Sequence, residues 1–448
     1  MYSDPRGSVK GRFANLLFQG NLVKDSLTLS IKLNLSANYE QKALLLRTMD
    51  SYRDAMNYVS RYAFTQLDKR ANKRKLNDLL YRELRIRYNL PSQLAQSAIR
   101  RVASTYQGEW TKIKQNAEHR KLGYTKKYYH GLEKAPEFKS RTTEIVYGRD
   151  YSFGKNQTAS VNTLEGRVRV AYEGWTPHVE RLRSGEWKIG TAKLWYDKGR
   201  KALYLIVPIT REQSVDLNDM TQVQGVDVGM RYLAVVDTGE KPIFVKGSPI
   251  HHKKRHLQRL RKRLQEKGTR SAKRRLAALS RRERRLTPDV NHRLSRKIAQ
   301  PQVLVGIEDL THIRVKINTK RKDTEERRQA EQWAFADLHS KILYKSSLYG
   351  GYATRQDAHY TSQGCPRCEH KSKNNRPGKG LLFTCEACGY TLHADLVGGR
   401  NVRLRTLVAR QGRTITGRVS TVPDVDSNDT GPDPVEESRN PLTLVRGS

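Results

Sequence analysis

The feature that most restricts the fold of this chain is a pair of Cys-x-x-Cys motifs near its C-terminal end. They contain every cysteine of the sequence, Cys365, Cys368, Cys385 and Cys388. Two such pairs at this separation are typical of a zinc site, and four thiolates form closed, structural sites. The insert between the pairs is rich in Lys, Asn, Arg, Gly and Pro. It cannot build a core of its own, so a bound zinc ion would order it. We therefore predict a zinc ribbon.

Two disulfides in a secreted protein are the alternative to zinc. No secretory signal opens the sequence and no further cysteine is present, so we favour zinc. Gly389 follows the second pair and is able to adopt the positive φ that lets backbone amides approach a thiolate. Glu369 holds the matching place after the first pair.

The charge of the chain indicates the kind of partner. The formal net charge is +40, far more than solubility requires, which indicates a polyanionic partner. The sequence has no apolar run near the roughly 20 residues of a membrane span. Phe is scarce, which disfavours a basic amphipathic helix on a membrane surface. We therefore predict binding to nucleic acid and not to a membrane.

The N-terminal half alternates between strand and helix signals. Residues 1–26 are predicted to be a flexible N-terminus, and apolar residues then alternate strictly over 27–35, as in a half-buried strand. Asn38 and Gln41 form the pattern of a helix capping box, and helices follow to about residue 120. Strand signals return over 143–210. The two strand regions predict one β-barrel or sandwich into which a helical block is inserted.

Two segments have compositions that suit nucleic acid. Residues 121–142 interleave Lys and Arg with aromatic side chains that are able to stack on bases; an exposed basic linker is an equally good interpretation. Residues 251–300 contain 19 Lys and Arg against three acids, too many for pairing along a helix. We predict one long helical stretch over 251–297 with a packed leucine stripe and cations that contact phosphates. The candidate nucleic-acid-binding residues are Lys126, Lys127, Tyr128, Tyr129, Lys253, Lys254, Arg255, Arg259, Arg261, Arg263, Lys273, Arg274 and Arg275.

Three acids lie at the ends of predicted elements in the second half. Asp227 sits in a short apolar strand, where a carboxylate is costly unless something pairs with it; for this residue alone, metal binding and a capped structural role are both open. Glu308 ends a buried strand, and Asp395 begins a helix. Two-metal cleavage of a phosphodiester needs carboxylates that hold two divalent ions about 4 Å apart, and magnesium prefers oxygen ligands. The order of elements indicates an RNase H-like fold.

These motifs resemble the TnpB family of transposon-encoded RNA-guided nucleases and the compact type V CRISPR effectors. The resemblance is carried, in order across residues 225–401, by GVDVGMRYLAVVD, VGIEDL, WAFADLHSKILYKSSLYGG, YTSQGCPRC and CEACGYTLHADLVGGRN. The segment PEFKS at 136–140 is also similar but less distinctive.

The resemblance implies an α/β multidomain protein with an RNase H-like RuvC nuclease domain and an inserted zinc ribbon. The implied parts are a wedge β-barrel (27–36 and 143–215), a helical recognition lobe (37–142), a RuvC-like nuclease domain (221–360 and 390–410) and a zinc ribbon (361–389). Residues 411–448 are rich in Pro, Asp, Ser, Thr and Gly, which predicts a disordered, flexible tail. Asp227, Glu308 and Asp395 would be the catalytic acids and would bind two magnesium ions. Guide RNA and double-stranded target DNA would be the partners, bound by a monomer or a homodimer on one guide, in the prokaryotic cytosol or nucleoid.

The sequence departs from the family pattern near the third acid. Where the family usually has Asp-x-Asn-Ala-Ala-x-Asn, residues 395–401 read DLVGGRN. Each of the two glycines weakens a helix by roughly 1 kcal/mol relative to Ala. The connection between His292 and Val303 is also shorter than usual and would be able to shift Glu308. None of these changes removes an acid, so we predict an active magnesium-dependent RNA-guided DNA endonuclease.

Two other functions fit the same sequence. One is an RNA-guided DNA-binding repressor that does not cleave, because members of this group that lose acids act in this way. The other is a transposase that uses RNase H-like chemistry to join strands, which ranks lower because the sequence offers no separate end-binding domain such as a helix-turn-helix.

Overall fold

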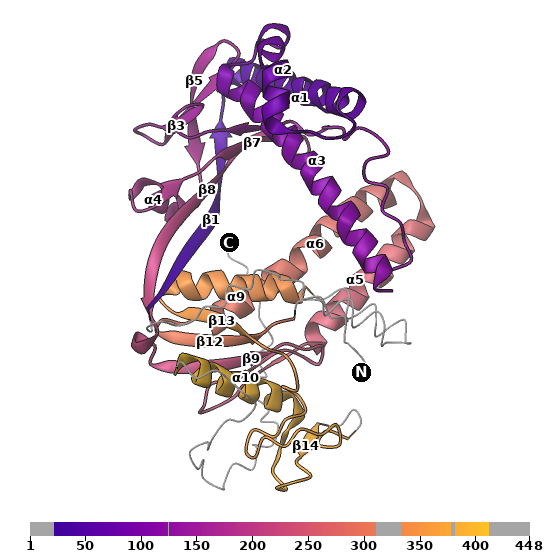
Figure 1. The fold of residues 1–448 in the computed structure, drawn as a ribbon, viewed down its shortest axis with the longest axis vertical. Helices are drawn as coiled ribbons and strands as arrows, with labels where there is room; N and C mark the ends of the chain where they lie inside the picture. Colours follow the sequence, from indigo (N-terminus) through magenta and orange to yellow (C-terminus); the bar gives the residue numbers. More distant parts are fainter. Residues whose placement is uncertain (1–21, 124, 311–333, 378–380, 412–448) are drawn as a thin grey trace, which may run out of the picture. The chain divides into compact units, whose positions relative to one another are not determined.

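The computed structural model describes residues 22–123, 125–310, 334–377 and 381–411 (Figure 1). The chain forms two compact units. One comprises residues 26–213, and the other comprises the described residues from 214 onward together with 22–25. The predicted flexible tail lies, from residue 412, outside the described residues, as does most of the predicted flexible N-terminus.

An eight-stranded sheet forms most of the first unit. Its order is β2-β7-β8-β1-β5-β4-β3, and β6 pairs with β8. The predicted alternation over 27–35 is confirmed, because all five apolar side chains there are buried. The strand begins at Leu22, earlier than predicted. The strands are β1 (Leu22–Ser36), β2 (Thr142–Ile145), β3 (Tyr151–Phe153), β4 (Thr158–Thr163), β5 (Gly166–Glu173), β6 (Lys188–Ile189), β7 (Ala192–Asp197) and β8 (Ala202–Asp216).

Three long helices lie between β1 and β2 in the chain, as the sequence predicts. The capping box at the first of them is confirmed. The Gln41 backbone N–H donates to Asn38 Oδ1 over 2.8 Å, and the Asn38 backbone N–H donates to Gln41 Oε1 over 3.0 Å. Arg141, just before β2, donates from Nε and Nη2 to the two carboxylate oxygens of Asp50, both over 2.7 Å. The helices are α1 (Tyr39–Gln66), α2 (Lys73–Arg87) and α3 (Ser92–Lys121), and the shorter α4 (Thr176–Arg183) follows β5.

A five-stranded sheet organises the second unit. Its order is β11-β10-β9-β12-β13, in which β9 is antiparallel to β10 and parallel to β12, and β12 is parallel to β13. Two of its strands, β10 and β12, are nearly continuous apolar runs, as expected for strands covered on both faces. A 3-10 turn, η1 (Leu217–Asp219), precedes the sheet. The strands are β9 (Gln222–Asp227), β10 (Tyr232–Asp237), β11 (Ile243–Lys246), β12 (Val303–Glu308) and β13 (Tyr352–Gln356).

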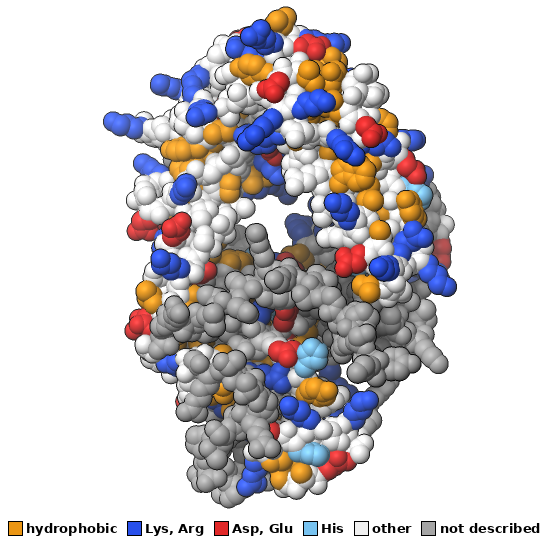
Figure 2. Space-filling view, viewed as in Figure 1, with side chains coloured by type: hydrophobic (Ala, Val, Ile, Leu, Met, Phe, Trp, Pro, Cys, Tyr) orange, Lys and Arg blue, Asp and Glu red, His pale blue; other side chains and the backbone are white. Residues whose placement is uncertain are grey.

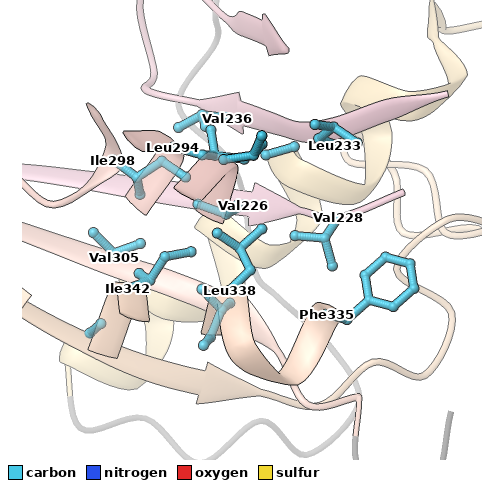
Figure 3. Close-up of a cluster of buried hydrophobic side chains, with 14 of the residues drawn as sticks. Val226, Val228, Leu233, Val236, Leu294, Ile298, Val305, Phe335, Leu338 and Ile342 are labelled. Carbon is cyan, nitrogen blue, oxygen red and sulfur yellow. The ribbon is translucent and has the colours of Figure 1, made fainter. Parts of the chain in front are cut away.

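Helices cover both faces of this sheet. α6 (Arg270–Ile298) and α9 (Phe335–Tyr349) pack on one face, where Leu294 and Leu338 meet Val226 in a buried cluster (Figure 3). α10 (Ala394–Arg410) packs on the other face against β9 and β10. The helix α5 (Ser248–Lys267) packs against α6.

The long basic helix predicted over 251–297 is two helices, because Gly268 adopts a left-handed conformation with φ 61° between α5 and α6. The predicted leucine stripe packs only in part. Leu279 on α6 is buried, whereas Leu260 on α5 is exposed and α5 has no buried residue among those described. The reason is that α5 packs mainly along α6, while Ile250 in its first turn packs against the sheet core without being fully buried.

A small hairpin forms the region of the cysteine pairs. β14 (Leu382–Thr384) pairs antiparallel with β15 (Thr391–His393), immediately before α10. Buried Phe383 and Leu392 join Val235 and Leu396 in a second cluster, on the α10 side of the sheet. Among the helices described, none combines the length and the apolar composition that crossing a membrane requires.

Candidate active site

Two of the three candidate acids lie at matching ends of neighbouring parallel strands. Asp227 ends β9 and Glu308 ends β12, and the register pairs Ile307 with Val226. The strand ends therefore meet at one edge of the sheet. The short connection before β12 leaves Glu308 in line with Asp227.

The pleat decides the face on which the acids lie. Val226 and Val228 point into the cluster beneath α6 and α9 (Figure 3). Because side chains alternate along a strand, Asp227 points to the opposite face, where α10 lies. Asp395 is in the first turn of α10. The packing of α10 on β9 thus brings the third acid to the same edge.

The electrostatics of Asp227 reflect this convergence. Burial, and then the charges of Glu308 and Asp395, raise the pKa of Asp227 well above its ordinary value, because each neighbouring carboxylate disfavours ionisation of the next. Burial also raises the pKa of Glu308, while a hydrogen bond from the Thr361 side chain opposes this. The three carboxylates predicted from separate parts of the sequence therefore lie close enough to interact.

Asp395 has one oxygen with a strong partner and one without. Arg376 Nη2 donates to Asp395 Oδ1 over 2.7 Å. Asp395 Oδ2 is buried and has no hydrogen-bond partner among the described residues. The Asp395 amide donates to Nδ1 of His393, which caps α10. His393 also packs edge-on against Phe244, so its role here is structural.

The donor set fits a divalent cation of the magnesium type. It consists of carboxylate oxygens, which magnesium prefers. A buried carboxylate oxygen without a partner is costly in the protein alone, and a cation would satisfy it. The same cation would reduce the repulsion that raises the pKa of Asp227.

Glycines allow α10 to approach the strand that carries Asp227. A Cβ added at Gly225 would lie 2.1 Å from Gly399 O and 2.3 Å from the Arg403 amide nitrogen. A Cβ at Gly398 would lie 2.8 Å from Asp227 Oδ2. The two glycines that depart from the family pattern are therefore packing positions, and Gly398 borders the candidate site itself.

The four cysteines form one cluster suited to zinc. Their Sγ atoms all lie within 4.8 Å of one another, with 3.7 Å between Cys365 and Cys388 and 3.5 Å between Cys368 and Cys385. These separations exclude disulfides in this conformation, since an S–S bond is about 2.05 Å. Four thiolates about 2.3 Å from a tetrahedral zinc ion are about 3.8 Å apart, so the cluster fits that ion.

Both knuckle turns use a left-handed residue. Gly389 has φ 67°, as its sequence position predicts, and Glu369 has φ 62°. A non-glycine residue pays a conformational cost there. The amide of Arg367 donates to Cys365 Sγ over 3.4 Å.

Comparison with known proteins finds similar sequences. A family model described as "Cas12f1-like, TNB domain" matches residues 335–402, and one described as "Probable transposase" matches residues 207–318. The chain is 27% identical over 250 residues to "CRISPR-associated endodeoxyribonuclease Cas12f1" of Sulfoacidibacillus thermotolerans, covering 50% of this chain and 56% of that protein. It is 24% identical over 294 residues to "Putative RNA-guided DNA endonuclease InsQ" of Escherichia coli K12, covering 62% of this chain and 70% of that protein.

The chain is a relative of TnpB proteins and compact type V effectors. The resemblance predicted from the motifs is thus confirmed. The match spans little more than half the length of the Cas12f1 relative. A solved structure titled "Structure of the mini-RNA-guided endonuclease CRISPR-Cas_phi3" aligns with 88% of this chain and 94% of its own at 11% identity, with a TM-score of 0.49.

Some of the candidate nucleic-acid-binding residues are exposed, and others are partly buried or bonded to neighbouring side chains. Tyr128 is exposed, and the Arg120 guanidinium lies over its ring, 5.1 Å from the centroid. The Tyr129 hydroxyl instead donates to Glu109 over 2.6 Å. Of the cations on α5 and α6, Arg261 pairs with Glu283, and burial lowers the pKa of Lys254. On the face shown in Figure 2, Lys and Arg side chains are spread widely and do not gather in one patch. The exposed candidates are Lys126, Lys127, Tyr128, Lys253, Arg255, Arg259, Arg263, Lys273, Arg274 and Arg275.

Sequence reasoning missed residues that position the acids. Arg376 lies in the charged insert between the cysteine pairs, where composition alone does not distinguish it from its neighbours. Asn401 Nδ2 on α10 donates to Thr361 O over 2.7 Å and to Gly364 O over 2.8 Å. It thereby ties the helix of Asp395 to the segment whose Thr361 meets Glu308. The match of Asn401 to the family pattern was the available signal.

Proposed function

We propose that this protein is an RNA-guided DNA endonuclease that hydrolyses phosphodiester bonds with Asp227, Glu308 and Asp395. The observation that carries the proposal is the convergence of three carboxylates, from β9, β12 and α10, at one sheet edge, where burial, and then the charges of Glu308 and Asp395, raise the pKa of Asp227. The names of two relatives, Cas12f1 and InsQ, support endonuclease activity on DNA. The strand order β11-β10-β9-β12-β13 supports an RNase H-like, RuvC-type nuclease domain.

The residues present have defined tasks in this chemistry. Asp227, Glu308 and the free oxygen of Asp395 would hold two magnesium ions, which supply an activated water and stabilise the leaving oxygen. Glu308 is 7% exposed, so few water molecules would compete with its carboxylate for a bound cation. Because Gly398 has no Cβ, the Asp227 carboxylate has room beside α10. The hydrogen bond from Asn401 to Thr361 O holds α10 in place relative to Thr361. The single DNA strand enters this edge with its scissile phosphate between the acids.

Base pairing between the guide RNA and the target DNA strand would select the target, as in other guided nucleases. We propose that the exposed cations of residues 126–127 and of α5 and α6 contact the phosphates of guide RNA or of its heteroduplex with DNA. Tyr128 would stack on an unpaired base. The first unit would contain the wedge barrel and the recognition lobe, with the ribbon as a zinc-bound insertion in the nuclease domain. A monomer or a homodimer on one guide is compatible with the proposal.

For the test, the protein is purified from cells that also carry the DNA that naturally flanks its gene. RNA that copurifies is sequenced, and the complex is incubated with magnesium and plasmids that carry the matching target. We expect one discrete RNA and cleavage of the matched plasmid only. Asp227→Asn should abolish cleavage, while Asp289→Asn, which changes an exposed acid of α6, should not.

Three other outcomes would each contradict part of the proposal. Cleavage by protein that carries no RNA would refute guiding. A discrete RNA with target binding but without cleavage, in wild type and Asp227→Asn alike, would identify the repressor. Strand-transfer products would identify the transposase.

A further inference from the structure

A positive charge from the ribbon lies within the cluster of candidate acids. Arg376 follows the first cysteine pair by eight residues, and its Nη2 is 2.7 Å from Asp395 Oδ1. The side chains of Arg376 and Asp395 retain 29% and 18% of their exposure, so the pair is shielded but remains reachable by a small ion. The contact joins the ribbon insert directly to the first turn of α10.

Arg376 is held in place by the residue before it. Asn375 is fully buried, and its Nδ2 donates to Gln363 O over 2.9 Å and to His370 O over 3.1 Å. Its Oδ1 accepts from the Glu386 amide over 3.0 Å, and its carbonyl oxygen accepts from the Thr384 amide over 2.9 Å. Asn375 thus connects the segments around both cysteine pairs. The position of the Arg376 guanidinium therefore depends on the folded ribbon.

We propose that Arg376 stands in for a divalent cation on Asp395, so that the guanidinium and the cation compete for this carboxylate and the ribbon sets the cation affinity of the site. The inference rests on the proposed function, because it takes the three acids to be a cation site.

The competition follows from charge and geometry. The three acids carry at most three negative charges, and Arg376 neutralises one of them through a charge-assisted hydrogen bond. A divalent cation that binds Asp395 must displace the guanidinium or remain beside a like charge, and either event weakens its binding. The opposite role is that Arg376 only orients Asp395 for the cation. Removal of Arg376 would then weaken binding, so the sign of the change distinguishes the two roles.

The test compares Mn²⁺ binding to the full-length protein by isothermal titration and by thermal melting. The variants are Arg376→Gln, Arg376→Met, and Lys373→Gln as the matched control, because Lys373 is an exposed cation of the same insert. An opposite charge at this range changes the affinity of a carboxylate for a cation by about tenfold or more. We expect Arg376→Gln to bind Mn²⁺ about tenfold more tightly. Lys373→Gln should stay within a factor of about two of wild type, since Arg376, and not Lys373, is the cation that pairs with Asp395 and acts on Asp227.

Two further comparisons locate the effect. Without metal, Arg376→Gln should melt below wild type, because an uncompensated carboxylate remains, and Mn²⁺ should raise its melting temperature more than that of wild type. In the background of Asp395→Asn, Arg376→Gln should have little further effect on Mn²⁺ affinity. If Arg376→Gln does not fold, Arg376→Met provides the comparison, since it also removes the charge and the hydrogen bond to Asp395 and should bind Mn²⁺ more tightly than wild type.

The outcomes separate this inference from the proposed function. Equal or weaker Mn²⁺ binding by the Arg376 variants would overturn the competition alone. If wild-type protein binds no Mn²⁺ at a site that Asp227→Asn removes, the proposed metal-dependent function fails as well.

Discussion

Replacing Gly398 with Ala should leave the fold stable and impair the candidate site. The alanine Cβ would lie 2.8 Å from Asp227 Oδ2, 2.9 Å from its Cγ and 3.2 Å from its Cβ. Carbon atoms in contact prefer about 3.5–4.0 Å, so the Asp227 carboxylate must move by roughly 0.5 Å or more. The same substitution removes a glycine from a helix, which favours folding by about 1 kcal/mol. The two effects act on different properties, so stability and activity should separate.

The expected loss of activity follows from the tolerance of such sites. Catalytic groups must be held within about 0.5 Å of their productive geometry, and a displacement of about 1 Å costs on the order of a hundredfold. We therefore expect Gly398→Ala to lower the magnesium-dependent cleavage rate by about ten- to a hundredfold. Its melting temperature should stay within a few degrees of wild type, because about 1 kcal/mol corresponds to about 2–4 °C in a unit of this size.

Gly399→Ala is the matched control. Its Cβ would lie 3.2 Å from Val235 O, 3.3 Å from Gly225 O and 3.5 Å from the Asp237 amide nitrogen, without meeting Asp227. It makes the same change in the same helix, so it should retain most of the cleavage activity. The TnpB family usually has Ala at both positions, which by itself would suggest that either change is harmless. If Gly398→Ala cleaves within a factor of about two of wild type, the reasoning from the Asp227 contact is wrong.

Three further predictions follow from the same unit. Gly225→Ala should destabilise the protein by about 3 kcal/mol, the upper end of the usual cost of overpacking, because the backbone atoms it meets cannot move away separately. Chemical denaturation measures this, and a change below about 1 kcal/mol would contradict the close approach of α10. Glu369→Gly should stabilise the ribbon by about 1 kcal/mol, by relieving the left-handed φ, and would show as slower loss of zinc to a chelator; faster loss would refute it. Asp227→Asn should stabilise the metal-free protein increasingly as pH rises above about 4. Above this pH the Asp227 carboxyl of the unfolded chain ionises, while the native carboxyl, with its raised pKa, keeps its proton, so the wild type loses stability until the pH reaches the native pKa. A difference in melting temperature that is independent of pH would count against the carboxylate cluster.

Short-range patterns were readable from the sequence. The alternation over 27–35, the capping box of Asn38 and Gln41, and the spacing of the cysteines each depend on residues a few positions apart. Such patterns fix which face of an element is buried and where it begins, because strand pleat and helix pitch are local properties. Local patterns were less informative where an element ends or breaks. The sequence predicted one basic helix over 251–297, whereas Gly268 divides it.

The arrangement of the candidate site needed the tertiary structure. The sequence indicated Asp227, Glu308 and Asp395 as acids at element ends, but only the parallel register of β9 and β12 and the packing of α10 bring them to one edge. The pairing of Arg376 with Asp395 and the contact of Gly398 with Asp227 left no signal in composition or spacing. The physical reason is that periodicity and spacing record interactions within an element. Contacts between residues far apart in the chain depend on how whole elements pack, which the sum of many weak, non-local contacts decides.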